Sequence, residues 1–167
     1  SDPQALARIH MVLAVFGFMG LLVVGFSQIL VPMFALAGPP RARPGWVHLG
    51  LAVTAILVFL AGAALHNQPA LVAAAGLGLG AATTYLWLMR KTLRKGMRKR
   101  LGLPFLLIKT AWALLVLGLL VGLGVLLGAP IPNGAVLFGF LILVGWLLTF
   151  LLGILQRIMP FLASMHV

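Results

Sequence analysis

The 167-residue chain contains no cysteine and only one acidic residue, Asp2. Without cysteine it cannot form disulfides, iron–sulfur clusters, thiolate zinc sites or the covalent C-x-x-C-H attachment of c-type haem. Without carboxylates in its apolar segments, it lacks the side chains that usually carry protons or bind sodium in ion-coupled transporters. The sequence also offers no nucleophile or phosphate loop for hydrolytic or transfer chemistry. These absences favour a non-enzymatic protein, and enzymatic activity stays open.

Hydrophobic residues make up 63% of the chain and charged residues only 8%, which is outside the range of soluble domains. The apolar segments are continuous instead of alternating, and this favours helices over barrel strands. Turn-forming residues separate the segments, among them Pro44 and Gly45 before the second one. We predict an all-α membrane bundle, a single transmembrane domain with five helices at about 5–37, 46–66, 69–93, 103–128 and 134–165.

Positive charge gathers in two of the predicted loops. Arg41 and Arg43 lie between the first two helices, and seven basic residues lie in the loop 90–102 between the third and fourth. The positive-inside rule places these loops in the cytoplasm, the N-terminus in the periplasm and the C-terminus in the cytoplasm. The basic loop lacks the interleaved aromatics of a nucleic-acid platform. We expect it to contact anionic lipids of the bilayer along residues 90–100.

An internal repeat links the first and last predicted helices. Six residues recur 128 positions later in the chain. On a continuous α-helix the six positions fall within one arc of about 120°, which also includes His10. We predict a four-helix unit followed by the first helix of its repeat, with this arc facing inward. The recurring pairs are Leu13/Leu141, Gly17/Gly145, Gly25/Gly153, Gln28/Gln156, Pro32/Pro160 and Ala35/Ala163.

Two glutamines belong to this repeat, and each precedes a proline by four residues: Gln28 before Pro32, and Gln156 before Pro160. Proline at this spacing frees the glutamine carbonyl from its helical hydrogen bond and predicts a kink. We interpret each glutamine side chain as a partner of local backbone or of a neighbouring helix, in preference to a ligand. All four residues are kept as candidate site positions.

The four histidines are the candidates for metal or haem binding: His10, His48, His66 and His166. His48 and His66 are 18 residues apart, so they point the same way from opposite ends of one helix, separated by about 27 Å. The predicted topology pairs His10 with His66 on the outer side and His48 with His166 on the inner side. Paired histidines can clamp haem b or, with methionine, hold copper. The alternative is that these helix-end histidines lie in the membrane interface.

Two stretches resemble the H…G…G…(I/L)-P-M-F segments of NnrS-like membrane proteins. One runs from His10 through Gly17-Phe18 and Gly25 to Val31-Pro32-Met33-Phe34, and the other from Gly153 to His166. The resemblance covers mainly the first and last helices. It implies a multi-span protein of the bacterial inner membrane, associated with haem and copper and with nitric-oxide metabolism, and distantly similar to haem–copper oxidase subunits. It marks His10 and His166 as the matching histidines. Such proteins are longer, so this chain is expected to be a fragment or a shortened relative.

We therefore expect a haem b- or copper-binding redox or accessory protein of a respiratory or nitric-oxide-related system. Paired histidines would be its ligands, with the first metal site at His10 and His66. It would act with other membrane subunits or as a homo-oligomer, and without nucleic acid. Two alternatives stay open. One is a structural or assembly subunit without a cofactor, in which glycine-rich helices pack against partners. The other is a channel or carrier for a small solute, with the first and last helices as moving parts.

Overall fold

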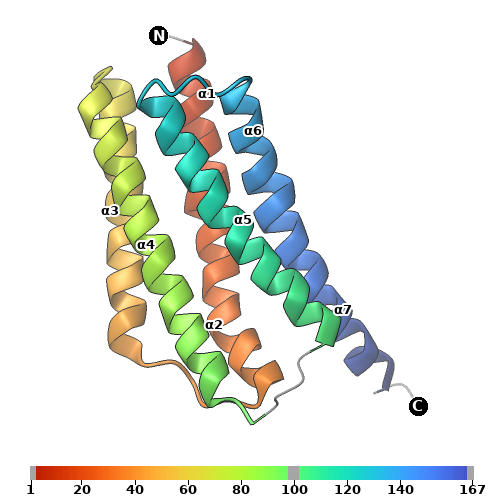
Figure 1. Ribbon diagram of the computed structural model, residues 1–167. Helices are drawn as coiled ribbons and strands as arrows, with labels where there is room; N and C mark the ends of the chain where they lie inside the picture. The colour runs from red at the N-terminus through yellow and green to blue at the C-terminus, as the bar shows by residue number, and fades with distance from the viewer. Residues whose placement is uncertain (1–2, 98–101, 165–167) are drawn as a thin grey trace.

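The computed structural model describes residues 3–97 and 102–164, except the side chains of Gln4 and Phe161. Every regular element in this part of the chain is a helix, and five helices are long and apolar enough to cross a membrane (Figure 1). The prediction of an all-α bundle with five transmembrane helices is therefore confirmed. The first span comprises α1 (Pro3–Val12), η1 (Leu13–Gly20) and α2 (Leu21–Ala35); the middle spans are α3 (Ala42–Ala64), α4 (Gln68–Lys95) and α5 (Gly102–Leu126); the last comprises α6 (Gly134–Phe140), η2 (Leu141–Leu148) and α7 (Thr149–Ser164).

The second span begins earlier than the sequence predicts. Helix α3 starts at Ala42, so Pro44 lies inside its first turn and does not end the linker. Proline is tolerated there because the N–H groups of a helix's first turn have no intrahelical partner, and its fixed φ suits the helix.

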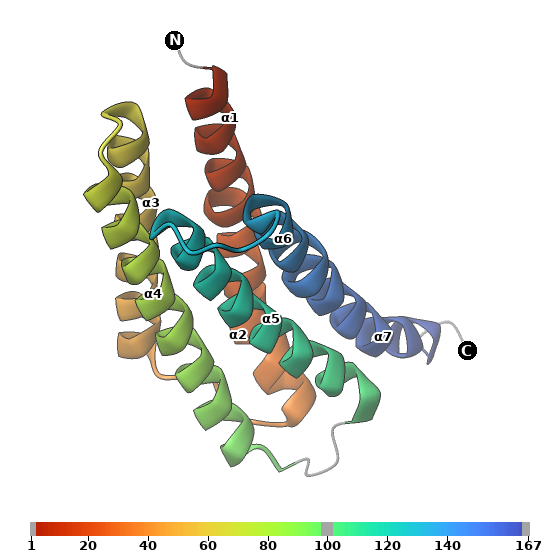
Figure 2. The same cartoon turned by 45° about the horizontal axis from the view of Figure 1, so that its top comes forward.

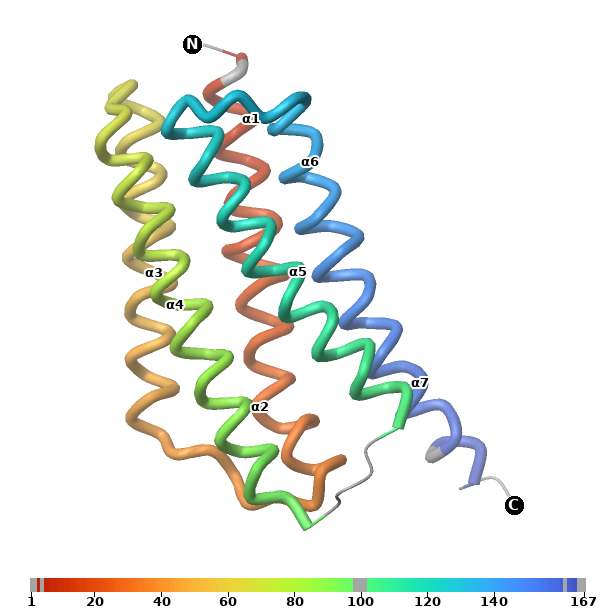
Figure 3. The backbone as a smooth tube through the Cα atoms, in the orientation of Figure 1, coloured from red at the N-terminus to blue at the C-terminus, as the bar shows by residue number. Residues whose placement is uncertain are grey.

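The loops lie at two opposite ends of the bundle (Figures 1 and 3). The N-terminus, the α3–α4 turn and the α5–α6 turn share one end. The α2–α3 loop and the C-terminal part of α4 share the other, which we call the basic end because it carries residues 41–43 and 90–95. At this end Arg157 of α7 lies over the Phe34 ring of α2, with 5.9 Å between its guanidinium carbon and the ring centre. The described parts of the two predicted basic loops therefore lie on the same side of the bundle, and residues 98–101 lie outside the described residues.

The core lies between α4, α5 and the last span, with α2 closing it. Helices α3 and α4 form one antiparallel pair, and α5 packs along α6, η2 and α7 (Figure 2). The largest fully buried side chains come from α4, α5 and η2, and include Tyr85, Met89, Phe105, Ile108 and Ile142.

Gly118 and Gly122, four residues apart on α5, lie where this helix packs closely against the last span. A Cβ atom at Gly118 would lie 2.8 Å from Ile142 Cδ1, and one at Gly122 would lie 2.9 Å from the Phe138 ring. Only glycine lets α5 approach the last span this closely. Gly78, which lies in a similar glycine cluster of α4, meets nothing within 4 Å.

The repeat extends to the backbone. Segments η1 and η2 are both eight-residue π-helices, and they begin 128 residues apart, at Leu13 and Leu141. The two segments touch: Phe16 stacks on Trp146 at 6.2 Å between ring centres, and a Cβ at Gly20 would lie 3.2 Å from the same indole. The sequence gives no sign of these π-helices because both segments are apolar on every side, so no hydrophobic face marks the change of period.

The prediction that the repeated arc faces inward is wrong for both copies. Leu13 is 42% exposed but Leu141 only 8%, whereas Pro32 is buried and Pro160 exposed. An extra residue per turn in a π-helix rotates the following helix by about 100°, so residues before and after it no longer share one face. The neighbours also differ, because only the first copy packs its second half against α4.

Candidate functional site

The structure does not bring His10 into the bundle. Its side chain is exposed on α1. His66 is also exposed, and α1 and the α3–α4 turn share one end of the molecule (Figure 1). His166 lies outside the described residues. Within residues 3–97 and 102–164, no three or more His, Cys, Asp or Glu side chains gather as they would around a metal ion.

His66 forms the turn between α3 and α4. It adopts the left-handed conformation with φ 51°, and the N–H of Asn67 donates to the Gly62 carbonyl at 2.8 Å, which is the closing bond of a Schellman motif. The Asn67 side chain then caps α4 by accepting from the Ala70 N–H at 3.1 Å. The turn geometry thus accounts for the backbone at this position.

His48 is the histidine that the fold buries. It lies in the second turn of α3 and is only 5% exposed. Its Nδ1 lies 2.8 Å from the Ala81 carbonyl oxygen of α4. Because a carbonyl only accepts, Nδ1 must carry the proton and donate it. The neutral ring then presents a lone pair at Nε2, which is buried and has no partner among the described residues. Metal-ligating histidines typically show this arrangement.

Three further side chains join His48 in what we call the polar cluster. Tyr85 of α4 lies beside the His48 ring, and Ser27 of α2 and Trp112 of α5 contact Tyr85. The Tyr85 hydroxyl donates to Ser27 Oγ at 2.6 Å, and Ser27 donates onward to the Val24 carbonyl at 2.7 Å. The Tyr85 ring centre lies 5.5 Å from that of His48 and 6.0 Å from that of Trp112. Trp112 Nε1 is buried and has no partner within the described chain. Four of the five membrane-spanning helices meet at this cluster.

Of the two repeated glutamines, only Gln28 lies next to the polar cluster. It is half-buried and follows Ser27 on α2, and its Oε1 would lie 3.4 Å from a Cβ at Gly45, one turn before His48. Gln156 and Pro160 are exposed on α7. The repeat therefore places equivalent residues in different surroundings.

The sequence analysis did not single out Ser27, Tyr85 or Trp112. One signal was available: Tyr85 is the only tyrosine of the chain and lies inside an apolar span. A phenol in such a position needs a hydrogen-bond partner from another helix. The partner itself, 58 residues away in sequence, could not be identified without the fold.

The donor set of the polar cluster can be tested against haem b and copper. The buried Nε2 of His48 is a nitrogen donor of the kind that would hold a haem iron. Copper prefers several nitrogen or sulfur ligands, and the cluster supplies a single imidazole. The polar cluster therefore offers one nitrogen donor, which either group could take as one of its ligands.

The chain matches no protein-family model, no curated protein and no solved structure. Its function is therefore argued from the site.

Proposed function

We propose that this chain is a membrane accessory protein that binds haem b or copper for a respiratory or nitric-oxide-related system, and that His48 is the ligand. The observation that supports this is the unpartnered Nε2 of His48, buried where α3 packs on α4. The proposal moves the ligand from His10 and His66, which are exposed, to the inner histidine.

The energetics of His48 support a ligand role. A buried acceptor without a partner costs about 1–3 kcal/mol, and a bound iron or copper would satisfy it. The bond from Nδ1 to the Ala81 carbonyl holds the ring and fixes the tautomer. Tyr85 packs against the same ring. These neighbours orient the imidazole before any ligand binds.

When bound, haem or copper would supply one-electron chemistry. His48 would hold the metal, and Tyr85 would keep the imidazole in place through its ring contact. The location in a bacterial inner membrane, with the N-terminus in the periplasm, is part of the proposal. It is supported by the placement of the basic loops at one end.

The test is a spectrum of the protein purified from membranes in mild detergent, together with iron and copper analysis. We expect a Soret band or stoichiometric copper that His48→Ala abolishes. His10→Ala and His66→Ala serve as controls and should retain it, because both side chains are exposed. A protein with neither a Soret band nor stoichiometric metal would refute the cofactor proposal. A signal that survives His48→Ala would refute the ligand assignment.

An assembly role without a cofactor is the second candidate, and the exposed half of the repeat favours it. Pro32 and Ala35 are buried in the first copy, whereas Pro160 and Ala163 are exposed in the second. A face that is packed in one copy and open in the other is suited to a partner helix. Co-purification of a stoichiometric membrane partner by the cofactor-free protein, lost in Ala163→Trp, would support this role.

A further inference from the structure

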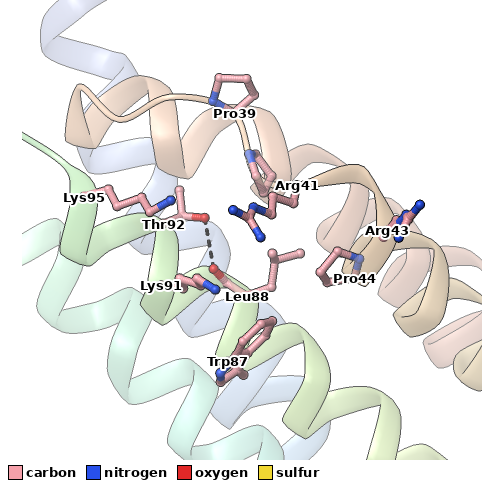
Figure 4. Close-up of a pocket in the computed structure, with 10 residues that line it drawn as sticks. Pro39, Arg41, Arg43, Pro44, Trp87, Leu88, Lys91, Thr92 and Lys95 are labelled. Atoms are coloured by element: carbon pink, nitrogen blue, oxygen red, sulfur yellow. Dashed lines mark hydrogen bonds between the residues drawn. The ribbon is translucent and has the colours of Figure 1, made fainter.

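A pocket of about 260 Å³ opens at the basic end, between the α2–α3 loop and the last turns of α4 (Figure 4). Pro39 and Pro40 of the loop and Pro44 in the first turn of α3 stiffen one side of the pocket, because each has a fixed φ. The α4 side includes Leu88 and Thr92, and Thr92 uses its own hydroxyl on the Leu88 carbonyl at 2.9 Å. The pocket therefore has preformed walls.

Three cationic side chains converge on this pocket: Arg41 from the loop, and Lys91 and Lys95 from α4 (Figure 4). The Lys91 ammonium lies 4.7 Å from the centre of the Trp87 ring, which holds it at the pocket wall. Like charges that line one pocket repel one another. The chain's only acidic side chain is Asp2, so the sequence has almost nothing with which to neutralise them. An anion from outside the chain would neutralise the three cations.

Arg43 provides an internal comparison. It belongs to the same segment as Arg41 and also borders the pocket, but its guanidinium points away from the three converging cations (Figure 4). The convergence is therefore a property of particular side chains and not of the net charge of this end.

We propose that this pocket binds a phosphate group, supplied by the head group of an anionic phospholipid. Arginine and lysine together bind phosphate through charge-assisted hydrogen bonds, and the guanidinium can do so with two bonds at once. Trp87 is 53% exposed beside the pocket, as expected of an aromatic residue at the membrane surface. The pocket places cationic side chains beside the apolar Trp87 and Leu88. The cations suit a phosphate, and the apolar residues suit the acyl chains to which a lipid phosphate is attached. This proposal adds a defined pocket to the general attraction expected of residues 90–100, and it does not depend on haem or copper.

The experiment is a titration of the full chain in detergent with phosphatidylglycerol, followed by native mass spectrometry, with phosphatidylcholine as the neutral reference. We expect preferential retention of phosphatidylglycerol, which Arg41→Gln and Lys95→Gln each weaken about tenfold through the loss of a charge-assisted bond. Arg43→Gln removes the same charge and should change retention less than about twofold, because only screened long-range attraction is lost. Helical content by circular dichroism identifies a variant that fails to fold. If Arg41→Gln or Lys95→Gln fails in this way, the proposal is judged on the other of the two.

A second arm separates the two sources of phosphate. Inorganic phosphate at millimolar concentration is expected not to displace the lipid. Displacement by inorganic phosphate that depends on Arg41 would support the phosphate site and overturn the lipid as its source. Equal retention of phosphatidylglycerol by the wild type and by the Arg41→Gln, Lys95→Gln and Arg43→Gln variants would overturn the site itself.

Discussion

At the residue scale, the polar cluster is held together by hydrogen bonds that are not equivalent. Ser27 both accepts from Tyr85 and donates to the Val24 carbonyl, whereas the Tyr85 hydroxyl has Ser27 as its acceptor. Both side chains are buried in the apolar core. Removing the Ser27 hydroxyl leaves the buried Tyr85 donor without an acceptor. Removing the Tyr85 hydroxyl leaves no buried donor unsatisfied, because Ser27 still donates to Val24.

Ser27→Ala is expected to destabilise the protein more than Tyr85→Phe. The first change leaves a buried phenol donor without an acceptor, at a cost of about 1–3 kcal/mol, whereas the second leaves Ser27 bonded to Val24 and costs about 0.5–1.5 kcal/mol. The Ser27→Ala/Tyr85→Phe double variant should lose less than the sum of the two. Thermal unfolding in detergent, followed by tryptophan fluorescence, measures all three. Strict additivity would contradict the hydrogen bond.

Leu36→Gly is expected to stabilise the protein by about 1 kcal/mol, because a leucine held in the left-handed region is strained. Leu36 follows α2 with φ 51°, and the Ala37 N–H closes the turn on the Pro32 carbonyl at 2.9 Å. The melting temperature should rise by about 2–4 °C. Leu36→Ala is the control, since alanine keeps the left-handed strain. If alanine raises the melting temperature as much as glycine, strain is not the cause.

At the element scale, the spans were predictable and their internal geometry was not. Continuous hydropathy places α5 and the last span almost to the residue, because crossing a membrane requires about 20 apolar residues. Burial of His48 depends on how α3 packs on α4, and the hydropathy of either helix alone does not specify this packing. The π-helices could not be predicted either. Their own residues are apolar around the whole helix, so no polar face reveals a change in the number of residues per turn.

The repeated glycines Gly153 and Gly25 give a matched test of element packing. A Cβ at Gly153 would lie 2.9 Å from the Pro104 carbonyl oxygen and 2.9 Å from Ile108 Cγ1, whereas one at Gly25 would meet nothing within 4 Å. We expect Gly153→Ala to destabilise the protein by about 1–3 kcal/mol through overpacking. Gly25→Ala should be neutral or stabilise by up to about 1 kcal/mol through helix propensity. Unfolding in detergent compares the two, and similar effects of both changes would contradict the α5–α7 contact.

At the scale of the whole molecule, the basic end and the opposite, N-terminal end predict how the bundle is oriented in the membrane. The sequence predicts which loops share a side, and the fold places the α2–α3 loop beside the end of α4 as expected (Figure 1). The ligand pair proposed from sequence depended instead on where each histidine lies around its helix. The π-helix that begins at Leu13 rotates His10 relative to later residues of the same span, and the pairing of His10 with His66 stays a prediction.

The cysteine-free sequence permits a direct test of orientation. Ala129→Cys lies in the exposed α5–α6 turn, and Gly38→Cys lies in the exposed α2–α3 loop, where a side chain meets nothing within 4 Å. We expect a membrane-impermeant maleimide to label Ala129→Cys on intact bacterial cells that express the chain, and Gly38→Cys only after the membrane is opened. The opposite pattern would reverse the topology, and equal labelling of both would indicate two orientations.

The matched π-helices also bear on the history of the chain. Each contains its extra residue at the same place, and the spacing of 128 residues is kept from Leu13/Leu141 through Ala35/Ala163. Had each helix acquired its residue after the duplication, two independent insertions at one position would be needed. A single insertion in the ancestral helix explains both. A duplication of a helix that already contained the widened turn is thus the more economical account of two π-helices that begin at equivalent positions.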